Sequence, residues 1–311
     1  MSSLNVAVLG EDALERAAAA QAFGKKSSSE DLEFYHSVFQ GKIINVVNPT
    51  AYPKKLSALT QALCLCDFAL VLAPMPSPVL GELIIALDLL ENKAVFVSGF
   101  DLSPFIANTR LRDSRVFASA DEARFFLLEQ ENTLVEGGCK IVLDHCFEVK
   151  GVGTVALGVV KSGVLSVHDE LTAFPSGKGV QIKSIQKNDQ DVKQAFTGDR
   201  VGLCLKNVKA EELERGTVLA KSGVSTVKDL KCVASVSKYS KTPIASGSAL
   251  HLAAGLQFEP VRVECDSEVK PGGSGTVVLK AEKPFALTQG ERMLLCDLNA
   301  KGPRVIGVAT A

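Results

Sequence analysis

The sequence predicts an α/β domain with a doubly wound parallel sheet, followed by two all-β barrel domains. Over residues 1–137, short apolar runs alternate with helix-forming stretches, which is typical of parallel strands buried on both faces and connected by helices. From residue 138 onward the helical period disappears. Short Val-rich runs separated by Gly, Pro and Asp then predict antiparallel strands. We therefore expect three domains, over residues 1–137, 138–224 and 225–311.

The strands of the first domain are predicted from apolar, β-branched runs that end at turn-forming residues. These runs are Asn5–Leu9, Lys42–Val47, Phe68–Ala73, Ala94–Ser98 and Arg115–Ala118. The intervening Ala-rich or Leu-rich stretches predict helices over Asp12–Phe23, Leu56–Leu65, Val79–Glu91 and Asp121–Glu131. Gly24 follows the first helix, where Gly commonly ends one, and the polar residues Lys25–Glu30 are expected to form a loop.

Each barrel is predicted from six short runs of high β-propensity. In the second domain they are residues 140–149, 153–160, 169–175, 180–186, 199–205 and 217–220. In the third domain they are residues 230–238, 249–254, 261–266, 275–280, 292–297 and 304–310. The polar stretch Lys221–Lys228 is expected to be the linker between the barrels.

The composition limits the classes of function. The chain has 311 residues, 46% hydrophobic and 22% charged, with a net charge of −1, which excludes a strongly basic nucleic-acid coat. Aromatic residues make up 6% and Trp is absent, which argues against a stacked single-strand platform. The charge balance, counted as Lys and Arg minus Asp and Glu, is −6 over residues 1–137 and +5 over residues 138–311. Only the second part is therefore expected to tolerate a polyanion.

We expect a cytoplasmic protein that does not enter a membrane. The sequence begins without a basic segment and a long apolar core, so it predicts no signal peptide. The apolar stretch Ala62–Pro74 is interrupted by Asp67 and is too short to span a bilayer.

The eight cysteines are expected to be reduced and mostly buried. No CxxC pair or His partner has the spacing of a zinc site, so we expect no metal site. The close pair Cys64 and Cys66 lies in an apolar setting that favours an inert role in the core over a redox role. The others are Cys139, Cys146, Cys204, Cys232, Cys265 and Cys296.

The second domain carries a recognisable series of motifs. A Gly-x-Gly-Thr-Val-x-x-Gly turn spans Gly151–Gly158, a Gly-Asp-x-Val-Gly-Leu strand spans Gly198–Leu205, and an Arg-Gly-x-Val-Leu exit spans Arg215–Leu219. Over about eighty residues this order resembles domain 2 of the translational GTPases. Residues 225–311 are similar, more distantly, to domain 3 of that family. Elongation factor Tu and above all the selenocysteine-specific factor SelB are the members that the chain most resembles.

The resemblance implies that residues 1–137 have a P-loop-GTPase-like fold, so a phosphate loop is expected after the first strand. Such a loop needs Gly-x-x-x-x-Gly-Lys-Ser/Thr for the phosphates and Mg²⁺. In this chain the corresponding segment is Gly10 to Ala17. Glu15 replaces the second Gly, Arg16 replaces the Lys, and Ala17 replaces the residue whose hydroxyl binds Mg²⁺. Acidic residues in the first helical turn also favour the helix dipole without any ligand. We therefore expect GTP and Mg²⁺ binding to be lost and no cofactor to replace it, although a neutral or cationic ligand in the same place stays open.

The other nucleotide motifs of the family are altered too. The Asp-x-Pro-Gly-His motif becomes Asn48–Tyr52, with Asn48 for the Mg²⁺-binding Asp, Ala51 for the Gly and Tyr52 for the water-positioning His. The guanine motif Asn-Lys-x-Asp becomes Ser98–Asp101, in which only Asp101 is kept. The resemblance therefore implies that no catalytic residue remains.

The resemblance also implies an RNA-binding pocket on the second domain. In the carriers of aminoacyl-tRNA, the 3′ end docks near the strand before the Gly-x-Gly turn. The matching positions are Asp144, His145 and Phe147, with Leu157 further along. His145 and Leu157 differ from the usual residues of the family, and Phe147 is equally explained as part of the barrel core.

Three interpretations of the function follow. The first is a translation-factor-like protein that binds tRNA, the ribosome or another factor through residues 138–311 without hydrolysing GTP. The second is a residual or partner-activated GTPase acting as an elongation factor. The third is a regulatory subunit that mimics a factor and competes for its partner. DNA is not an expected partner.

Overall fold

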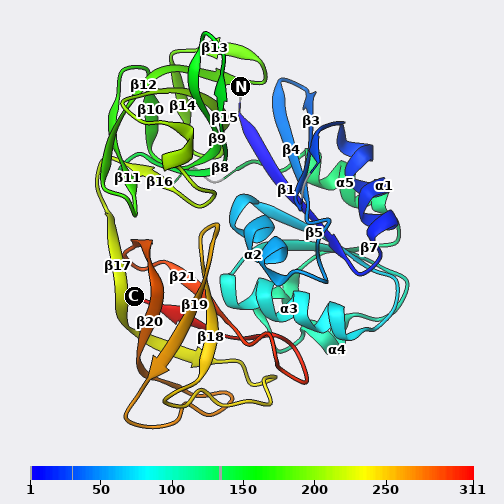
Figure 1. Cartoon of the computed structure of the whole chain (residues 1–311). Coiled ribbons are helices and arrows are strands. Elements are labelled where there is room, and N and C mark those ends of the chain that lie inside the picture. The colour runs from blue at the N-terminus through cyan, green and yellow to red at the C-terminus, as the bar shows by residue number, and fades with distance from the viewer. Residues whose placement is uncertain (1, 30, 133–134) are drawn as a thin grey trace.

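The computed structural model describes residues 2–29, 31–132 and 135–311 and contains a seven-stranded sheet followed by two β-barrels. In Figure 1 the sheet and its helices occupy one side of the molecule, and the two barrels are stacked on the other side. The predicted fold class is thus confirmed. The domain boundaries at residues 137 and 224 stay predictions.

The sheet has the strand order β2-β3-β4-β1-β5-β6-β7. Strands β4, β1, β5, β6 and β7 are parallel, whereas β2 and β3 form an antiparallel hairpin that extends the sheet at the β4 edge. The bounds are β1 Ser3–Gly10, β2 Lys25–Ser29, β3 Glu33–Phe39, β4 Lys42–Asn48, β5 Phe68–Ala73, β6 Lys93–Ser98 and β7 Val116–Phe117.

Helices cover both faces of this sheet, as a doubly wound arrangement requires. Phe23 of α1 and Leu127 of α5 belong to the apolar core on one face, and Leu59 of α2 and Leu83 of α3 belong to the core on the other. The bounds are α1 Ala13–Phe23, α2 Leu56–Leu65, α3 Pro78–Leu90, α4 Ser103–Ile106, α5 Ala120–Leu128, and the 3₁₀ turns η1 Arg110–Asp113 and η2 Ala210–Glu212.

The hairpin β2–β3 corrects the sequence prediction. Lys25–Ser29 is a strand rather than a loop, and Glu33–Phe39 is a further strand that the pattern did not indicate. The polar sequence of β2 lacks the apolar alternation of a strand because β2 lies at the edge of the sheet and pairs only with β3. Glu30, the last residue of the predicted loop, lies outside the described residues.

The first barrel consists of the six strands that the sequence predicts, in the order β11-β16-β8-β9-β15-β12, and pairing of β11 with β12 closes it. Its bounds are β8 Lys140–Val149, β9 Gly153–Ser162, β11 Glu170–Phe174, β12 Lys178–Lys187, β15 Arg200–Lys206 and β16 Val218–Ala220. Strand β13 Gln190–Val192 extends β12, and β10 Val164–Ser166 pairs with β14 Gln194–Phe196.

The second barrel closes in the order β17-β20-β19-β18-β21-β22 and also uses all six predicted runs. Its bounds are β17 Val224–Val236, β18 Ala249–Ala254, β19 Gln257–Glu264, β20 Ser274–Thr288, β21 Arg292–Cys296 and β22 Val305–Thr310. Val224 to Val227 pair with the end of β20, so most of the expected linker is strand. The pattern failed there because the side chains of this segment are mostly exposed.

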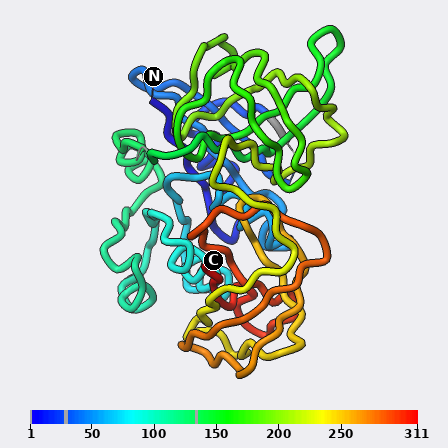
Figure 2. The backbone as a smooth tube through the Cα atoms, turned by 90° about the vertical axis from the view of Figure 1, so that its left-hand side faces the viewer, coloured from blue at the N-terminus to red at the C-terminus, as the bar shows by residue number. Residues whose placement is uncertain are grey.

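One apolar core joins all three parts of the chain. It includes α2 and α3, Val142 and Val159 of the first barrel, and Leu294 and Val305 of the second. Figure 2 shows the same packing from the side, with the C-terminal strand against the region of α3. The barrels therefore share buried surface with the first sheet. Among the described residues no helix combines the length and the apolarity needed to cross a membrane.

Gly24 and Gly81 offer a matched test of this packing. A Cβ atom at Gly24 would lie 2.2 Å from the carbonyl oxygen of His36, whereas a Cβ at Gly81, inside α3, would meet nothing within 4 Å. We expect Gly24→Ala to lower the free energy of unfolding by about 1–3 kcal/mol. Gly81→Ala should raise it by about 0.5–1 kcal/mol. Urea unfolding midpoints measure both, and equal midpoints would contradict the close approach of α1 to β3.

Candidate functional site

The turn from β1 into α1, where a phosphate loop was expected, is filled by the chain itself. β1 ends at Gly10, whose Cβ position lies 3.0 Å from the carbonyl oxygen of Leu72, so the chain passes close to β5 there. Asp12 caps α1, and its carboxylate accepts hydrogen bonds from the amides of Leu14 at 2.8 Å and Glu15 at 2.9 Å. Two amides of the first turn, of the kind that would bind an anion, are thus satisfied by the protein itself.

Arg16 is fully buried at the centre of this turn. Its Nη1 donates to the carbonyl oxygens of Gly10 at 2.7 Å and Glu11 at 3.0 Å. Its Nη2 donates to those of Tyr52 at 2.8 Å and Pro49 at 3.4 Å. Its Nε donates to Oδ1 of Asn48 at 3.2 Å, so all five guanidinium hydrogens are used.

The groups around the Arg16 side chain favour a positively charged group at this place. Burial lowers the pKa of Arg16, while the nearby Tyr52 and Asp12 favour the charged form. The backbone groups that surround the guanidinium are carbonyl oxygens, whereas a phosphate needs N–H donors. Ala17 supplies no hydroxyl, and no group of three or more metal-ligating side chains occurs in the part of the chain that the structure describes. The residues present therefore do not fit a nucleoside triphosphate with Mg²⁺.

Asn48 at the end of β4 and Tyr52 in the following loop also have hydrogen-bond partners within the protein. Asn48 is buried and, besides accepting from Arg16, donates to Oε2 of Glu33 at 3.4 Å. Tyr52 is buried, and its hydroxyl donates to Oε1 of Glu82 at 3.1 Å. Burial and the adjacent carboxylate raise the pKa of Tyr52. Neither side chain is available to bind a metal ion or to position water.

The Tyr52 contact continues into the second barrel. Oε1 of Glu82 accepts from Nη2 of Arg304 at 2.5 Å, and Oε2 accepts from the Arg304 amide at 2.8 Å. Arg304 also donates from Nη1 to the carbonyl oxygen of Pro53 at 2.9 Å. The series Arg16, Tyr52, Glu82 and Arg304 thus links the altered phosphate loop to the start of β22.

The remaining predicted nucleotide positions do not converge on this cluster. Ser98 and Glu15 line a cavity of about 590 Å³ between α1 and the ends of β5 and β6. Ala51 is half-buried in the loop before α2. Asp101 is exposed, and its hydrogen bonds to Ser103 lower the pKa of this carboxyl. The structure thus separates the buried Arg16 cluster from the open cavity that Ser98 and Glu15 line.

On the first barrel, Asp144 is not available to a ligand. It is buried and holds both terminal nitrogens of Arg200 in an ion pair, one of them at 2.9 Å. The Arg200 guanidinium carbon lies 3.9 Å from the centre of the Phe34 ring in β3. The sequence prediction missed Arg200 and Phe34 because they are distant in sequence. An Arg within a predicted strand was the only signal for this pair.

The other three barrel candidates do lie together. His145 is exposed, with its ring centre 5.5 Å from that of Phe147, and it pairs across β8 and β9 with Leu157. Leu157 and Arg200 line a cleft of about 220 Å³ whose other wall is β3, including Phe34 and His36. The structure therefore places these residues at the border between the barrel and the first sheet.

The cysteines are mostly buried, as the sequence predicts. All eight are free thiols, and Cys64, Cys146 and Cys265 are half-buried while the rest are buried. Burial raises the pKa of Cys66 to about 12, so its reactive thiolate is scarce at neutral pH.

Removing the Arg16 side chain tests its structural role. Arg16→Ala leaves three buried carbonyl oxygens, the part-buried carbonyl oxygen of Glu11 and the Asn48 amide oxygen without their donor, so we expect the free energy of unfolding to fall by about 3–5 kcal/mol. The control is Leu14→Ala on the same helix, since Leu14 is 82% exposed and should cost less than about 0.5 kcal/mol. Urea unfolding measures both, and an equal cost for the two variants would contradict the buried cluster.

Comparison with known proteins places the chain in a family. The family model described as elongation factor Tu domain 2 matches residues 153–220. An uncharacterised protein of Methanocaldococcus jannaschii is 32% identical over 297 residues, covering 92% of this chain and 93% of the relative. The selenocysteine-specific elongation factor of the same organism is 32% identical over 179 residues, which are 51% of this chain and 38% of that factor.

Solved structures agree on the fold. The translation elongation factor SelB of Methanococcus maripaludis in its apo form has a TM-score of 0.84 at 21% identity and covers 99% of this chain and 79% of its own. The same factor in complex with the GTP analogue GPPNHP has a TM-score of 0.80 at 22% identity, covering 100% and 79%. These matches confirm the resemblance to the SelB- and Tu-like translation elongation factors: residues 153–220 match domain 2 of elongation factor Tu in sequence, and the whole chain shares the fold of SelB.

Proposed function

We propose that this chain is an elongation-factor-like protein that has lost GTP binding and hydrolysis and acts as a binding module for tRNA, the ribosome or another factor. The observation that carries the proposal is the buried Arg16 guanidinium, which fills the phosphate-loop turn with the protein's own cation. A triphosphate would have to displace this side chain and leave the carbonyl oxygens of Gly10 and Tyr52 unpaired, which costs free energy.

Charge adds to this obstacle. Glu11, Asp12 and Glu15 are exposed around the same turn. A carboxylate close to a phosphate near a protein surface costs on the order of 1–4 kcal/mol. Arg16 cannot offset this repulsion, because its five donors already have partners.

The alternative, a residual or partner-activated GTPase, requires residues that can hold Mg²⁺ and orient water. Asn48 carries no charge and its amide is hydrogen-bonded on both sides, and the Tyr52 hydroxyl is held by Glu82. A partner protein would have to break buried contacts before it could create a catalytic site. We therefore favour the binding module.

Calorimetry with GTP and with GDP, each with Mg²⁺, tests the loss of nucleotide binding. We expect no binding tighter than about 1 mM, because the phosphate site is filled. The positive control is SelB of Methanococcus maripaludis, which was crystallised with a GTP analogue. Low-micromolar binding of either nucleotide to this chain would overturn the proposal and favour the GTPase alternative.

The barrels supply the surface for RNA. Residues 138–311 have a charge balance of +5, which permits contact with phosphates. On β8, the exposed ring of His145 beside Phe147 can stack on an unpaired base, and the neighbouring Leu157 and Arg200 line the adjoining cleft. We place the single-stranded end of a tRNA there.

A tRNA binding assay on the whole chain tests this surface. His145→Ala is expected to weaken tRNA binding by at least about fivefold, the lower end for loss of one base stack. The control is His251→Ala on the second barrel, which also removes an imidazole stacked on a Phe ring, that of Phe258 at 5.0 Å. Fluorescence anisotropy at low salt measures the affinities. Unchanged binding by His145→Ala, or equal losses in both variants, would contradict the placement.

A further inference from the structure

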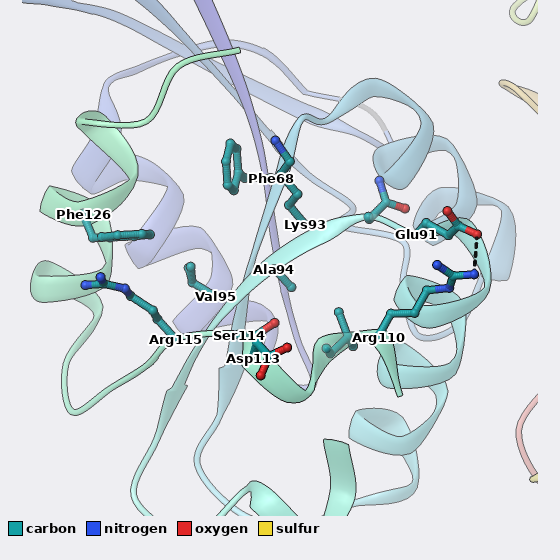
Figure 3. A pocket seen from close by; sticks show the side chains of 12 residues that line it. Phe68, Glu91, Lys93, Ala94, Val95, Arg110, Asp113, Ser114, Arg115 and Phe126 are labelled. Atoms are coloured by element: carbon teal, nitrogen blue, oxygen red, sulfur yellow. Dashed lines mark ion pairs between the residues drawn. The ribbon is translucent and has the colours of Figure 1, made fainter. Parts of the chain in front are cut away.

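A second cleft lies at the opposite edge of the first sheet from the Arg16 cluster. Its volume is about 520 Å³, and it adjoins the amino-terminal ends of β5 at Phe68 and β6 at Lys93. The turn η1 and the helix α5 form its other walls. Figure 3 shows the aromatic and charged side chains that surround it.

Two cations of this cleft are each placed over an aromatic ring. The Arg115 guanidinium carbon lies 4.8 Å from the centre of the Phe126 ring, and Nζ of Lys93 lies 5.2 Å from that of Phe68. Both cationic residues are exposed. Figure 3 shows these two pairs on one side of the cleft and Arg110 on the other side. Phe68 is buried, so the flat surface open to a base is the exposed Arg115 guanidinium beside the half-buried Phe126 ring. A flat guanidinium and an aromatic ring beside cationic groups are features that bind unpaired bases and their phosphates.

The two carboxylates that line the cleft, Glu91 and Asp113, each form an ion pair with an arginine. Glu91 lies 3.1 Å from Nη2 of Arg110 and 3.1 Å from Nη1 of Arg292, which comes from the second barrel. Asp113 lies 3.2 Å from Nε of Arg112. Positive charge therefore exceeds negative charge here, although residues 1–137 as a whole have a balance of −6.

The cations also extend beyond the cleft. The side chains of Arg110 and Arg112 are 65% and 70% exposed, and both lie on η1. With Arg115 they recur along one surface segment, so successive phosphates of a strand can each meet a guanidinium. A free nucleotide would use only the cleft, and an acidic peptide would gain nothing from the aromatic planes.

We propose that this cleft binds single-stranded RNA, with a base against Phe126 and Arg115 and the flanking phosphates along Lys93, Arg110 and Arg112. This binding involves no residue of the Arg16 cluster and none of His145, Phe147 and Leu157 on the first barrel. The inference therefore does not depend on the proposed tRNA contact of the barrels. It gives the chain a second RNA contact, on a domain whose net charge is negative.

The test measures binding of a labelled oligouridylate of about 12 nucleotides to the whole chain by fluorescence anisotropy, at about 50 mM salt. We expect the double variant Lys93→Ala, Arg115→Ala to bind about tenfold more weakly. The magnitude of the slope of log K against log salt should fall by about 0.7, for the one phosphate contact that is lost with Lys93. The matched control is Lys54→Ala, Lys55→Ala, which removes the same charge from exposed residues before α2. It should change binding less than about twofold.

Phe126→Leu separates stacking from charge. It keeps an apolar side chain and the net charge, and we expect at least about fivefold weaker binding with an unchanged salt slope. Unfolding midpoints must match the wild type for each variant. Failure of the wild type to bind the RNA, equal losses in the test and control pairs, or tighter binding of a labelled polyglutamate peptide would overturn the inference. If His145→Ala lost oligouridylate binding while the cleft variants bound as tightly as the wild type, the RNA site in this cleft would be refuted. The tRNA contact proposed on the first barrel would remain.

Discussion

The buried guanidinium of Arg16 is the interaction on which the first domain depends. It joins the end of β1, the turn into α1 and the loop after β4 through five hydrogen bonds. A buried charge is tolerated only when its donors are satisfied, so these acceptors cannot be altered one at a time without cost. The cluster stabilises the turn where the resemblance to translational GTPases predicts a phosphate loop.

This cluster is continuous with the contacts that hold the barrels. Tyr52 accepts a hydrogen bond from Arg16 through its carbonyl oxygen and donates one to Glu82 through its hydroxyl. Glu82 in turn binds Arg304 at the start of β22. Around this polar series, the apolar core joins α2 and α3 with both barrels. Side chains of the chain itself therefore hold the three parts together.

The sequence predicts most of the fold because its strands are either buried on both faces or alternate in closed barrels. It fails at β2, whose sequence is polar, and at the start of β17, whose side chains are mostly exposed, because neither segment carries an apolar pattern. In the site, alignment to a motif identifies Arg16, Asn48 and Tyr52, whereas the capping role of Asp12 comes from the structure. The partners of Arg16 could not be predicted because most are backbone carbonyl oxygens. The Asp144–Arg200 pair spans 56 residues and depends on the closure of the barrel.

The five acceptors around Arg16 also limit which substitutions this turn can tolerate. A change of Arg16→Lys supplies the residue type of a phosphate loop, but an ammonium group has three donors and leaves at least two acceptors unpaired. Such a variant is expected to be less stable before any phosphate is bound. Under the proposed loss of nucleotide binding, selection for stability alone would keep the arginine in place over evolutionary time.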